Sequence, residues 1–242
     1  VPLVLLTAAI GVLVAAHAWV DLPAGGSPAA FLGCLLLVEA GALATFTARD
    51  AVLFFVAFEL VLVPMWVLIS RYGDPHDAGA RTEAGYRFVL YTAVGSTLML
   101  VGILTLVTSA GTSDLWALAD GAGRALTPDR QLLVAGLLVA GLAVKVPVFP
   151  LHTWLPSAHT TAPTAGSVLL AAVLLKMGTY GLVRLPVATV PDGFARLAPV
   201  LAVLGVVGII WGGLICLVER DLKRLIAYSS VAHMGFVALA VA

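Results

Sequence analysis

Residues 141–178 constrain the fold more than any other part of this chain. The segment, GLAVKVPVFPLHTWLPSAHTTAPTAGSVLLAAVLLKMG, places Lys145 at the end of one long apolar run and Lys176 in the middle of the next. Between the two lysines, backbone hydrogen-bond donors are missing at Pro147, Pro150, Pro156 and Pro163. A membrane helix is interrupted in this way only where the freed carbonyl groups are buried in protein or line a water-filled cavity. The segment therefore predicts a broken helix beside a polar pathway.

The rest of the sequence is apolar enough to surround such a pathway with membrane-spanning helices. Of the 242 residues, 61% are hydrophobic and only 11% are charged, a balance that soluble domains do not reach. Eight apolar runs have a length suited to crossing a bilayer, at residues 1–20, 31–48, 51–70, 88–108, 131–150, 164–185, 197–218 and from about 225 onwards. We therefore predict an all-α, polytopic transmembrane helical bundle of about eight spans, in contact with the lipid bilayer.

Charge and cysteine content exclude several classes of function. The 13 basic and 13 acidic residues cancel, so nothing in the sequence favours a nucleic acid as a partner. Cys34 and Cys216 each lie in an apolar run and are interpreted as buried small side chains. No cysteine cluster or glycine-rich nucleotide loop indicates a redox cofactor in this chain. Because the sequence starts at Val1 and stops inside an apolar run, we expect a fragment of a longer protein.

Polar turns and loops connect the predicted spans. A turn with the sequence DLPAGGSP follows the first span, and longer polar loops cover residues 71–87 and 109–130. Basic residues divide six to five between the two sides of the predicted membrane, a small excess that favours a cytoplasmic position for the loops at 71–87 and 219–224.

Two carboxylic acids lie near the middle of consecutive predicted spans. Glu39 is at the centre of the second span, and Glu59 is near the midpoint of the third. An ionisable side chain at that depth costs about 2.5–3.5 kcal/mol on insertion scales, so such residues usually mark an ion or proton pathway. Pro64, five residues after Glu59, is expected to kink the third helix and to free a carbonyl group near the acid.

The acids and lysines together have the composition of a proton relay. Burial disfavours the charged form of a lysine and a nearby carboxylate favours it, so the position of Glu59 can set the protonation state of Lys145. The predicted relay consists of Glu59, Lys145 and Lys176, with Glu39, His152, His159 and His233 as further members, and the first two of these histidines are expected near a membrane face. The alternative is a static Glu59–Lys145 ion pair that holds two helices together.

Three segments carry a resemblance to a known family. They are FELVLVPMWVLISRYG (58–73), AVKVPVFPLHTWLPSAHTTAPTAGSVLLAAVLLKMGTYGLVR (143–184) and DLKRLIAYSSVAHMGF (221–236). The chain resembles the antiporter-like membrane subunits of respiratory complex I, NADH:quinone oxidoreductase, and its VPM after the glutamate resembles the M-type subunit. The resemblance implies inverted five-helix repeats, each with a broken helix. Residues 1–30 would form a leading span and turn, 31–186 the first repeat, and 187–242 the start of a truncated second repeat.

The resemblance also implies roles for individual residues. Glu59, Lys145 and Lys176 match the family's charged pathway positions, and Glu39 and His233 match further ones. Ser157 stands where the family commonly has an acidic residue. The implied function is that of a proton-translocating subunit of an oxidoreductase complex, with no cofactor in this chain. NADH, FMN, iron–sulfur clusters and quinone would belong to partner subunits.

The implied partners are other membrane subunits, especially neighbouring antiporter-like ones, and the implied location is a bacterial plasma membrane. A subunit of a multisubunit cation/proton antiporter or of a membrane-bound hydrogenase is the alternative function, since it would share the motif and differ in its partners. A passive structural spacer with unused charges is a third interpretation. Identification of NADH-oxidising subunits in the assembly would separate the first two, and the effect of changing Lys145 would test the third.

Overall fold

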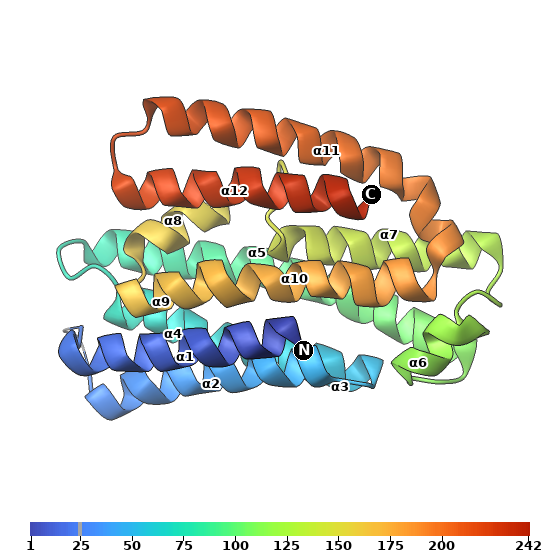
Figure 1. The fold of residues 1–242 in the computed structure, drawn as a ribbon, viewed down its shortest axis with the longest axis horizontal. Coiled ribbons are helices and arrows are strands. Elements are labelled where there is room, and N and C mark those ends of the chain that lie inside the picture. Colours follow the sequence, from blue (N-terminus) through green and yellow to red (C-terminus); the bar gives the residue numbers. More distant parts are fainter. Residues whose placement is uncertain (24–25) are drawn as a thin grey trace.

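The computed structural model describes residues 1–23 and 26–242, which form a bundle of long helices running along one common direction (Figure 1). The predicted all-α class is confirmed, because the described residues contain no β-strand apart from an isolated bridge between Asp50 and Asp114. The predicted turn after the first span includes Ala24 and Gly25, which lie outside the described residues.

The described residues form α-helices of very different lengths, in the following order along the chain. They are α1 (Pro2–Val20), α2 (Pro28–Thr47), α3 (Ala51–Leu60), α4 (Leu62–Tyr72), α5 (Ala78–Ala110), α6 (Leu115–Ala117), α7 (Pro128–Lys145), α8 (Trp154–Thr161), α9 (Thr164–Leu169), α10 (Leu175–Leu182), α11 (Pro191–Val218) and α12 (Leu222–Val241). Three π-helical turns accompany them: η1 (Leu118–Ala122), η2 (Leu170–Leu174) and η3 (Val183–Val187).

Seven helical runs in the described part of the chain are long and apolar enough to cross a membrane. They are α1, α2, α3 with α4, α5, the continuous run from α9 to η3, α11 and α12. The remaining predicted span, residues 131–150, is helical only as far as Lys145, where α7 ends, and α8 begins beyond it at Trp154. The predicted run that breaks off early is thus the one in which the sequence places Lys145 before several prolines.

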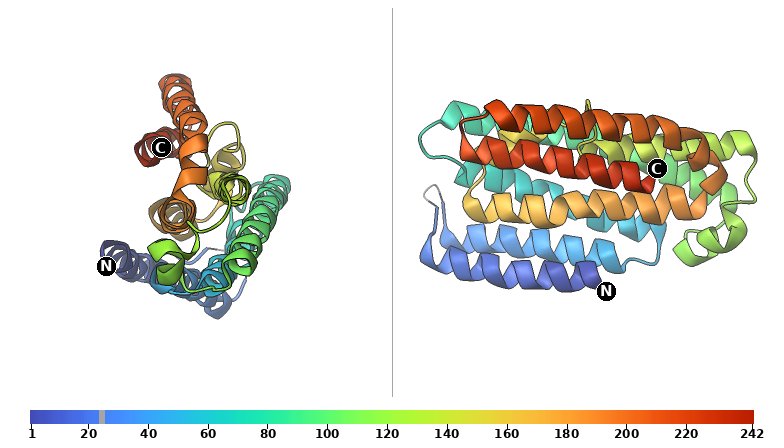
Figure 2. Two further views of the ribbon diagram at one scale, coloured as in Figure 1. Left: turned by 90° about the vertical axis from the view of Figure 1, so that its right-hand side faces the viewer. Right: turned by 45° about the horizontal axis from the view of Figure 1, so that its top comes forward.

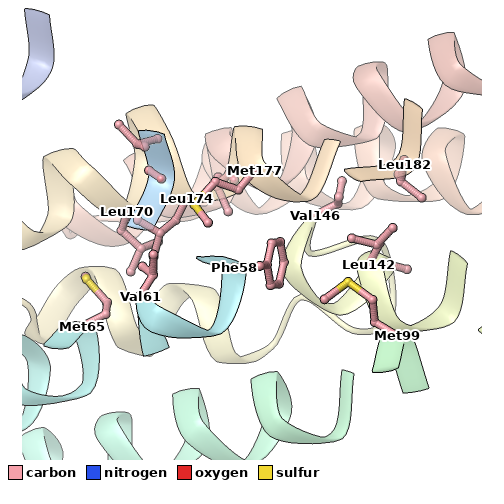
Figure 3. Packing of buried hydrophobic residues seen from close by; sticks show 14 of the residues in the cluster. Phe58, Val61, Met65, Met99, Leu142, Val146, Leu170, Leu174, Met177 and Leu182 are labelled. Atoms are coloured by element: carbon pink, nitrogen blue, oxygen red, sulfur yellow. The ribbon is translucent and has the colours of Figure 1, made fainter. Parts of the chain in front are cut away.

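The connecting loops lie at the two ends of the bundle, on the sides that the order of the predicted spans implies. The connections at 73–77 and 219–221 lie at one end, and those at 48–50 and 111–127 lie at the other (Figure 1). In the end-on view, α11 lies on the outside of the bundle, on the side opposite α1 and α2 (Figure 2). The core lies between α3–α4, α7 and the run from α9 to α10, where Phe58, Leu142 and Met177 are buried (Figure 3).

The first polar loop is shorter than predicted. We expected an irregular segment over residues 71–87, but α5 already begins at Ala78. The carboxylate of Asp77 accepts a hydrogen bond from the Ala80 N–H, which caps the helix. One turn further on, Glu83 and Arg87 form an ion pair at 2.5 Å, a spacing that supports helix on a polar face. Local capping and charge pairing thus extend the helix beyond its apolar part.

The second predicted loop, residues 109–130, contains α6 and η1 and closes the other end of the bundle. The Ala51 N–H donates to the Ser113 carbonyl and the Leu115 N–H donates to the Arg49 carbonyl, both at 2.8 Å. Asp50 caps α3 through the Val52 and Leu53 N–H groups and also accepts a hydrogen bond from the Ser113 hydroxyl. These bonds tie the start of the Glu59 helix to this end of the bundle.

Close contact between α5 and α7 depends on two glycines. A Cβ on Gly95 would lie 2.8 Å from the Gly141 carbonyl oxygen, and a Cβ on Gly141 would lie 2.5 Å from the Gly95 carbonyl oxygen. Small residues at such a crossing let two membrane helices approach closely. The contact fixes α5 beside the helix that carries Lys145.

Candidate functional site

The helix that begins as α7 is broken directly after Lys145. The backbone then turns through a segment that includes a cis Phe149–Pro150 peptide bond and becomes helical again at Trp154. The indole N–H of Trp154 donates to the carbonyl oxygen of Val144 at 2.9 Å. The Val148 N–H similarly donates to the Ala143 carbonyl at 3.0 Å. The predicted broken helix is confirmed, and the carbonyl groups of Ala143 and Val144 find hydrogen-bond partners inside the protein, as a membrane favours.

Lys145 is buried at this break, with 3% of its surface exposed. Its Nζ lies 5.0 Å from the ring centroid of Phe58 and 5.6 Å from that of Phe88. Both distances are within the range in which an aromatic ring attracts an ammonium group. The two rings come from α3 and α5, so three helices meet around the lysine side chain.

Glu59 lies in the last turn of α3, and its helix is interrupted immediately afterwards. The interruption is at Val61, between α3 and α4, and Pro64 lacks the N–H that would have bonded to the carbonyl of residue 60. The helix is therefore interrupted close to Pro64, where the sequence predicted a kink. The Ser96 hydroxyl donates to the Glu59 carboxylate at 2.5 Å, which orients the acid across the α3–α5 contact.

Glu59 and Lys145 interact electrostatically without direct contact. The Glu59 charge acts on the buried ammonium group, but the pair is absent from the ion pairs of the described residues, whose N–O distances are 2.5–3.8 Å. A static ion pair requires that contact. The arrangement instead leaves Lys145 between aromatic rings, while Glu59 is held by a hydroxyl group from a different helix.

Lys176 is on the next long run, where a π-helical turn precedes it. Its Nζ donates to the carbonyl oxygen of Ala171, within η2, at 2.8 Å. Single π-helical turns in an α-helix frequently accompany functional positions. Two residues later, a Cβ on Gly178 would lie 3.2 Å from the Cβ of Lys145. The helix of Lys176 therefore packs directly against the end of α7.

Lys176 and His233 line the same groove. This groove, of about 830 Å³, lies between the η2–α10 run and α12, and it includes Ser229 and Ser230. The Nδ1 of His233 lies 2.7 Å from the Ser229 carbonyl oxygen, a contact in which Nδ1–H is the donor. The tertiary structure thus brings together the predicted residues from the first and second predicted repeats.

Glu39 is apart from this group. Its carboxylate packs against Gly11 of α1, where a Cβ would overlap it. The crevice around it, of about 260 Å³, is otherwise lined mainly by apolar residues such as Leu35 and Leu169. The structure therefore places Glu39 between α1 and α2 and does not bring it to Lys145.

His152 and His159 are both buried, with 5% and 3% of their surfaces exposed. We expected both near a membrane face, and this stays a prediction. His152 lies in the turn between α7 and α8, stacked on Phe149 with a centroid distance of 5.4 Å. His159 is in the last turn of α8, towards the bundle end. Each has a buried ring nitrogen without a hydrogen-bond partner in the described residues, Nδ1 of His152 and Nε2 of His159.

Both the sequence and the fold of this chain match known proteins. A family model described as NADH:quinone oxidoreductase/Mrp antiporter, transmembrane, matches residues 48–242. This chain belongs to that family. It is accordingly an integral membrane protein, in agreement with its apolar helices.

Individual relatives of the family cover the whole chain. The chain is 46% identical over 242 residues to NAD(P)H-quinone oxidoreductase chain 4 1 of Synechococcus elongatus, spanning 100% of this chain and 44% of that protein. It is similar to a chain of respiratory complex I from Thermus thermophilus with bound NADH, at 33% identity and a TM-score of 0.84, covering 99% of this chain and 48% of that one. A chain of an archaeal membrane-bound sulfane sulfur reductase has 26% identity and a TM-score of 0.87, covering 98% and 48%. The chain thus spans less than half of the relatives it matches, and the M-type resemblance is confirmed.

Several contacts of the predicted relay residues have no signal in the sequence. Ser96 lies in an uncharged apolar run, yet its hydroxyl donates a hydrogen bond to Glu59. Phe58 and Phe88 carried no signal, since aromatic residues in apolar runs are usually core residues. The partner of Lys176 is a main-chain carbonyl group, that of Ala171. None of these contacts has a sequence pattern, because each joins positions that only the packing of helices brings together.

Proposed function

We propose that this chain is part of a proton-translocating membrane subunit of an NADH:quinone oxidoreductase, and that protons move through its buried acid and lysine side chains. The observation that carries the proposal is Lys145, buried at a broken helix within the electrostatic influence of Glu59 but without a direct ion pair. The identity to NAD(P)H-quinone oxidoreductase chain 4 along the whole chain supports the reaction class.

The central step is a change in distance between Glu59 and Lys145. When the carboxylate approaches, it stabilises the ammonium form, because the attraction between the charges grows as they come closer in a medium of low dielectric constant. When Glu59 is held away by Ser96, burial favours neutral Lys145, which then releases its proton. The interruptions after Glu59 and after Lys145 allow such local movements without unwinding a continuous helix.

The released proton passes towards Lys176 and then His233. The packing of Gly178 against Lys145 brings the two lysine-bearing helices together, and the groove of Lys176 and His233 continues towards α12. His152 and His159 would connect the break with the bundle end, since imidazole both accepts and donates protons near neutral pH. Glu39 would serve a separate branch between α1 and α2.

Electron transfer belongs to partner subunits in this proposal. NADH, FMN, iron–sulfur clusters and quinone would bind there, and this chain would contribute no redox group. Neighbouring antiporter-like subunits would cover part of its apolar surface, in a bacterial plasma membrane. Residues 31–186 would form the first five-helix repeat and 187–242 the beginning of the second.

Lys145→Arg in the assembled complex tests the proposal most directly. A guanidinium group keeps the positive charge but does not release a proton at working pH. We expect loss of proton uptake, together with lowered NADH oxidation through coupling to quinone reduction. The control is Arg220→Met, a charge change in an exposed loop. Wild-type values for both activities in the Lys145→Arg complex would show that Lys145 only holds a charge.

A second candidate function is a subunit of a multisubunit cation/proton antiporter or of a membrane-bound hydrogenase. The family model, whose description names Mrp antiporters beside NADH:quinone oxidoreductases, supports the antiporter alternative. The two functions differ in their partners, so mass spectrometry of the purified assembly separates them. NADH-oxidising subunits in the assembly support the first function, and their replacement by other subunits supports the second.

A further inference from the structure

The C-terminal end of α8 is held by groups from three other segments. A helix end leaves its last carbonyl groups without partners in the helix. In α8, the His159 carbonyl accepts a hydrogen bond from the Ser167 hydroxyl at 3.0 Å, and the Thr161 carbonyl accepts one from the Asp74 N–H at 2.8 Å. The Nζ of Lys223 donates to the carbonyl oxygens of Thr160 and Ala162, at 3.3 and 3.2 Å.

These donors come from parts of the fold that carry different relay residues. Asp74 follows α4, the continuation of the Glu59 helix, and Lys223 is in the first turn of α12, which carries His233. The approach of α4 is close, because a Cβ on Gly73 would lie 2.5 Å from the Thr161 carbonyl oxygen. The end of α8 is therefore clamped between the helix that follows Glu59 and α12, the second helix of the second predicted repeat.

Lys223 suits this position electrostatically. A positive charge near the last carbonyl groups of a helix is favourable, because the C-terminal end of the helix dipole is negative. The ammonium group also acts electrostatically on the imidazole of His159, one turn inside α8. It faces a cavity of about 420 Å³ at this end of the bundle, which His17, Asp21 and Asp74 also line.

The position of α8 depends on these end contacts. The helix has only eight residues and follows an irregular segment, and helices this short are not stable by themselves. We propose that Lys223 is a positioning residue, which fixes the end of α8 to the start of α12 and so holds His159 in register with the relay. This inference rests on the proposed proton-translocating function. In consequence, a shift of α12 is transmitted to α8 through the Lys223 ammonium group.

The test uses the full-length protein in its assembled complex, with Lys223→Met, Lys223→Arg and the control Arg220→Met. Met keeps the apolar stem of the lysine side chain but removes the hydrogen-bond donor, and Arg supplies a charged donor again. Hydrogen exchange of residues 154–163 is measured beside proton uptake during NADH oxidation. For Lys223→Met we expect α8 amides to exchange about tenfold faster, as the loss of charge-assisted hydrogen bonds implies. Proton uptake should fall with it, Lys223→Arg should restore both, and Arg220→Met should match wild type.

Two results would overturn the inference. Unchanged exchange in α8 for Lys223→Met would show that the lysine does not fix the helix, and faster exchange with normal proton uptake would show that the cap has no role in transfer. Exchange is measured whether or not the complex translocates protons, so failure of the proposed function is distinguishable from failure of this inference. If Lys223→Met does not assemble, Gly73→Ala tests the clamp from the other side. It should also accelerate exchange in α8, and normal exchange would contradict the clamp.

Discussion

Lys145 and Lys176 show two different ways of placing a lysine inside a membrane bundle. Lys145 is at the end of a broken helix, 3% exposed, with its ammonium group beside the rings of Phe58 and Phe88. Lys176 lies within a continuous helical run, and its ammonium group bonds to the Ala171 carbonyl beside an open groove. The Lys145 ammonium group is influenced by the charge of an acid that is not in contact with it, whereas the Lys176 ammonium group has its own backbone partner.

In the proposed pathway, this difference gives the two lysines different roles. A charge stabilised at a distance changes strongly when the acid moves, because the Coulomb energy depends on separation in a low-dielectric interior. A charge bonded to a main-chain carbonyl changes little unless the helix itself rearranges. We therefore expect control of proton transfer at Lys145 and conduction at Lys176.

The largest expected effect is that of alanine at Lys145. Lys145→Ala should lower proton transfer about a hundredfold or more, the usual effect of removing a group that exchanges the proton. Lys176→Ala should cost only about tenfold, because water in the groove can replace a lost polar group. Proton uptake during NADH oxidation, in vesicles with equal amounts of assembled complex, measures both. Equal losses would remove the distinction between the two lysines.

The next effect sharpens the role of the distant acid. Glu59→Gln should lower proton uptake about ten- to hundredfold while leaving assembly intact, because glutamine keeps the volume and removes the charge. Glu59→Asp should be milder. Glu39→Gln is the comparison variant and should lose less proton uptake, since Glu39 packs against Gly11 and lies apart from Lys145. Normal transfer in the assembled Glu59→Gln complex, or an equal loss for Glu39→Gln, would show that Glu59 has no special role in controlling transfer at Lys145.

A smaller effect is expected from the hydroxyl group that holds Glu59. Ser96→Ala removes a hydrogen bond to a charged group, worth about 1.5 kcal/mol or a factor of about ten, and should change the rate of proton uptake at constant assembly. Thr97→Ala is the control, because the Thr97 hydroxyl bonds within its own helix to Ala93 at 2.8 Å. Equal rates of proton uptake in the Ser96→Ala and Thr97→Ala complexes would show that the Ser96 hydrogen bond to Glu59 is not needed for transfer.

The smallest effects belong to the histidines. Single changes His152→Ala and His159→Ala should reduce proton uptake by roughly two- to threefold, because ordered water substitutes for a lost hydrogen-bonding group at a cost of about 0–2 kcal/mol. Rates measured in the two assembled variants test this. Complete loss of proton uptake in either variant would show that an imidazole group, and not Lys145, controls proton transfer.

The sequence by itself determined the helical membrane fold, the broken helix and the identity of the charged residues. Apolar runs of spanning length leave a chain few alternatives in a bilayer, because every backbone polar group must be satisfied internally. Pro64 and the prolines after Lys145 marked where helices are interrupted, since a missing N–H acts locally along the chain. The polar start of α5 was missed, because capping by Asp77 and the Glu83–Arg87 pair outweigh low hydrophobicity.

Only the tertiary structure decided which of these residues act together. It placed Glu59 near Lys145 without an ion pair, joined Lys176 to His233 through one groove, and left Glu39 against α1. It also showed hydrogen-bond partners that no sequence pattern indicates, namely Ser96 for Glu59 and the Ala171 carbonyl for Lys176. The physical reason is that a period of 3.6 residues tells which face of a helix is apolar, whereas the contacts of a polar group depend on how neighbouring helices are packed and rotated.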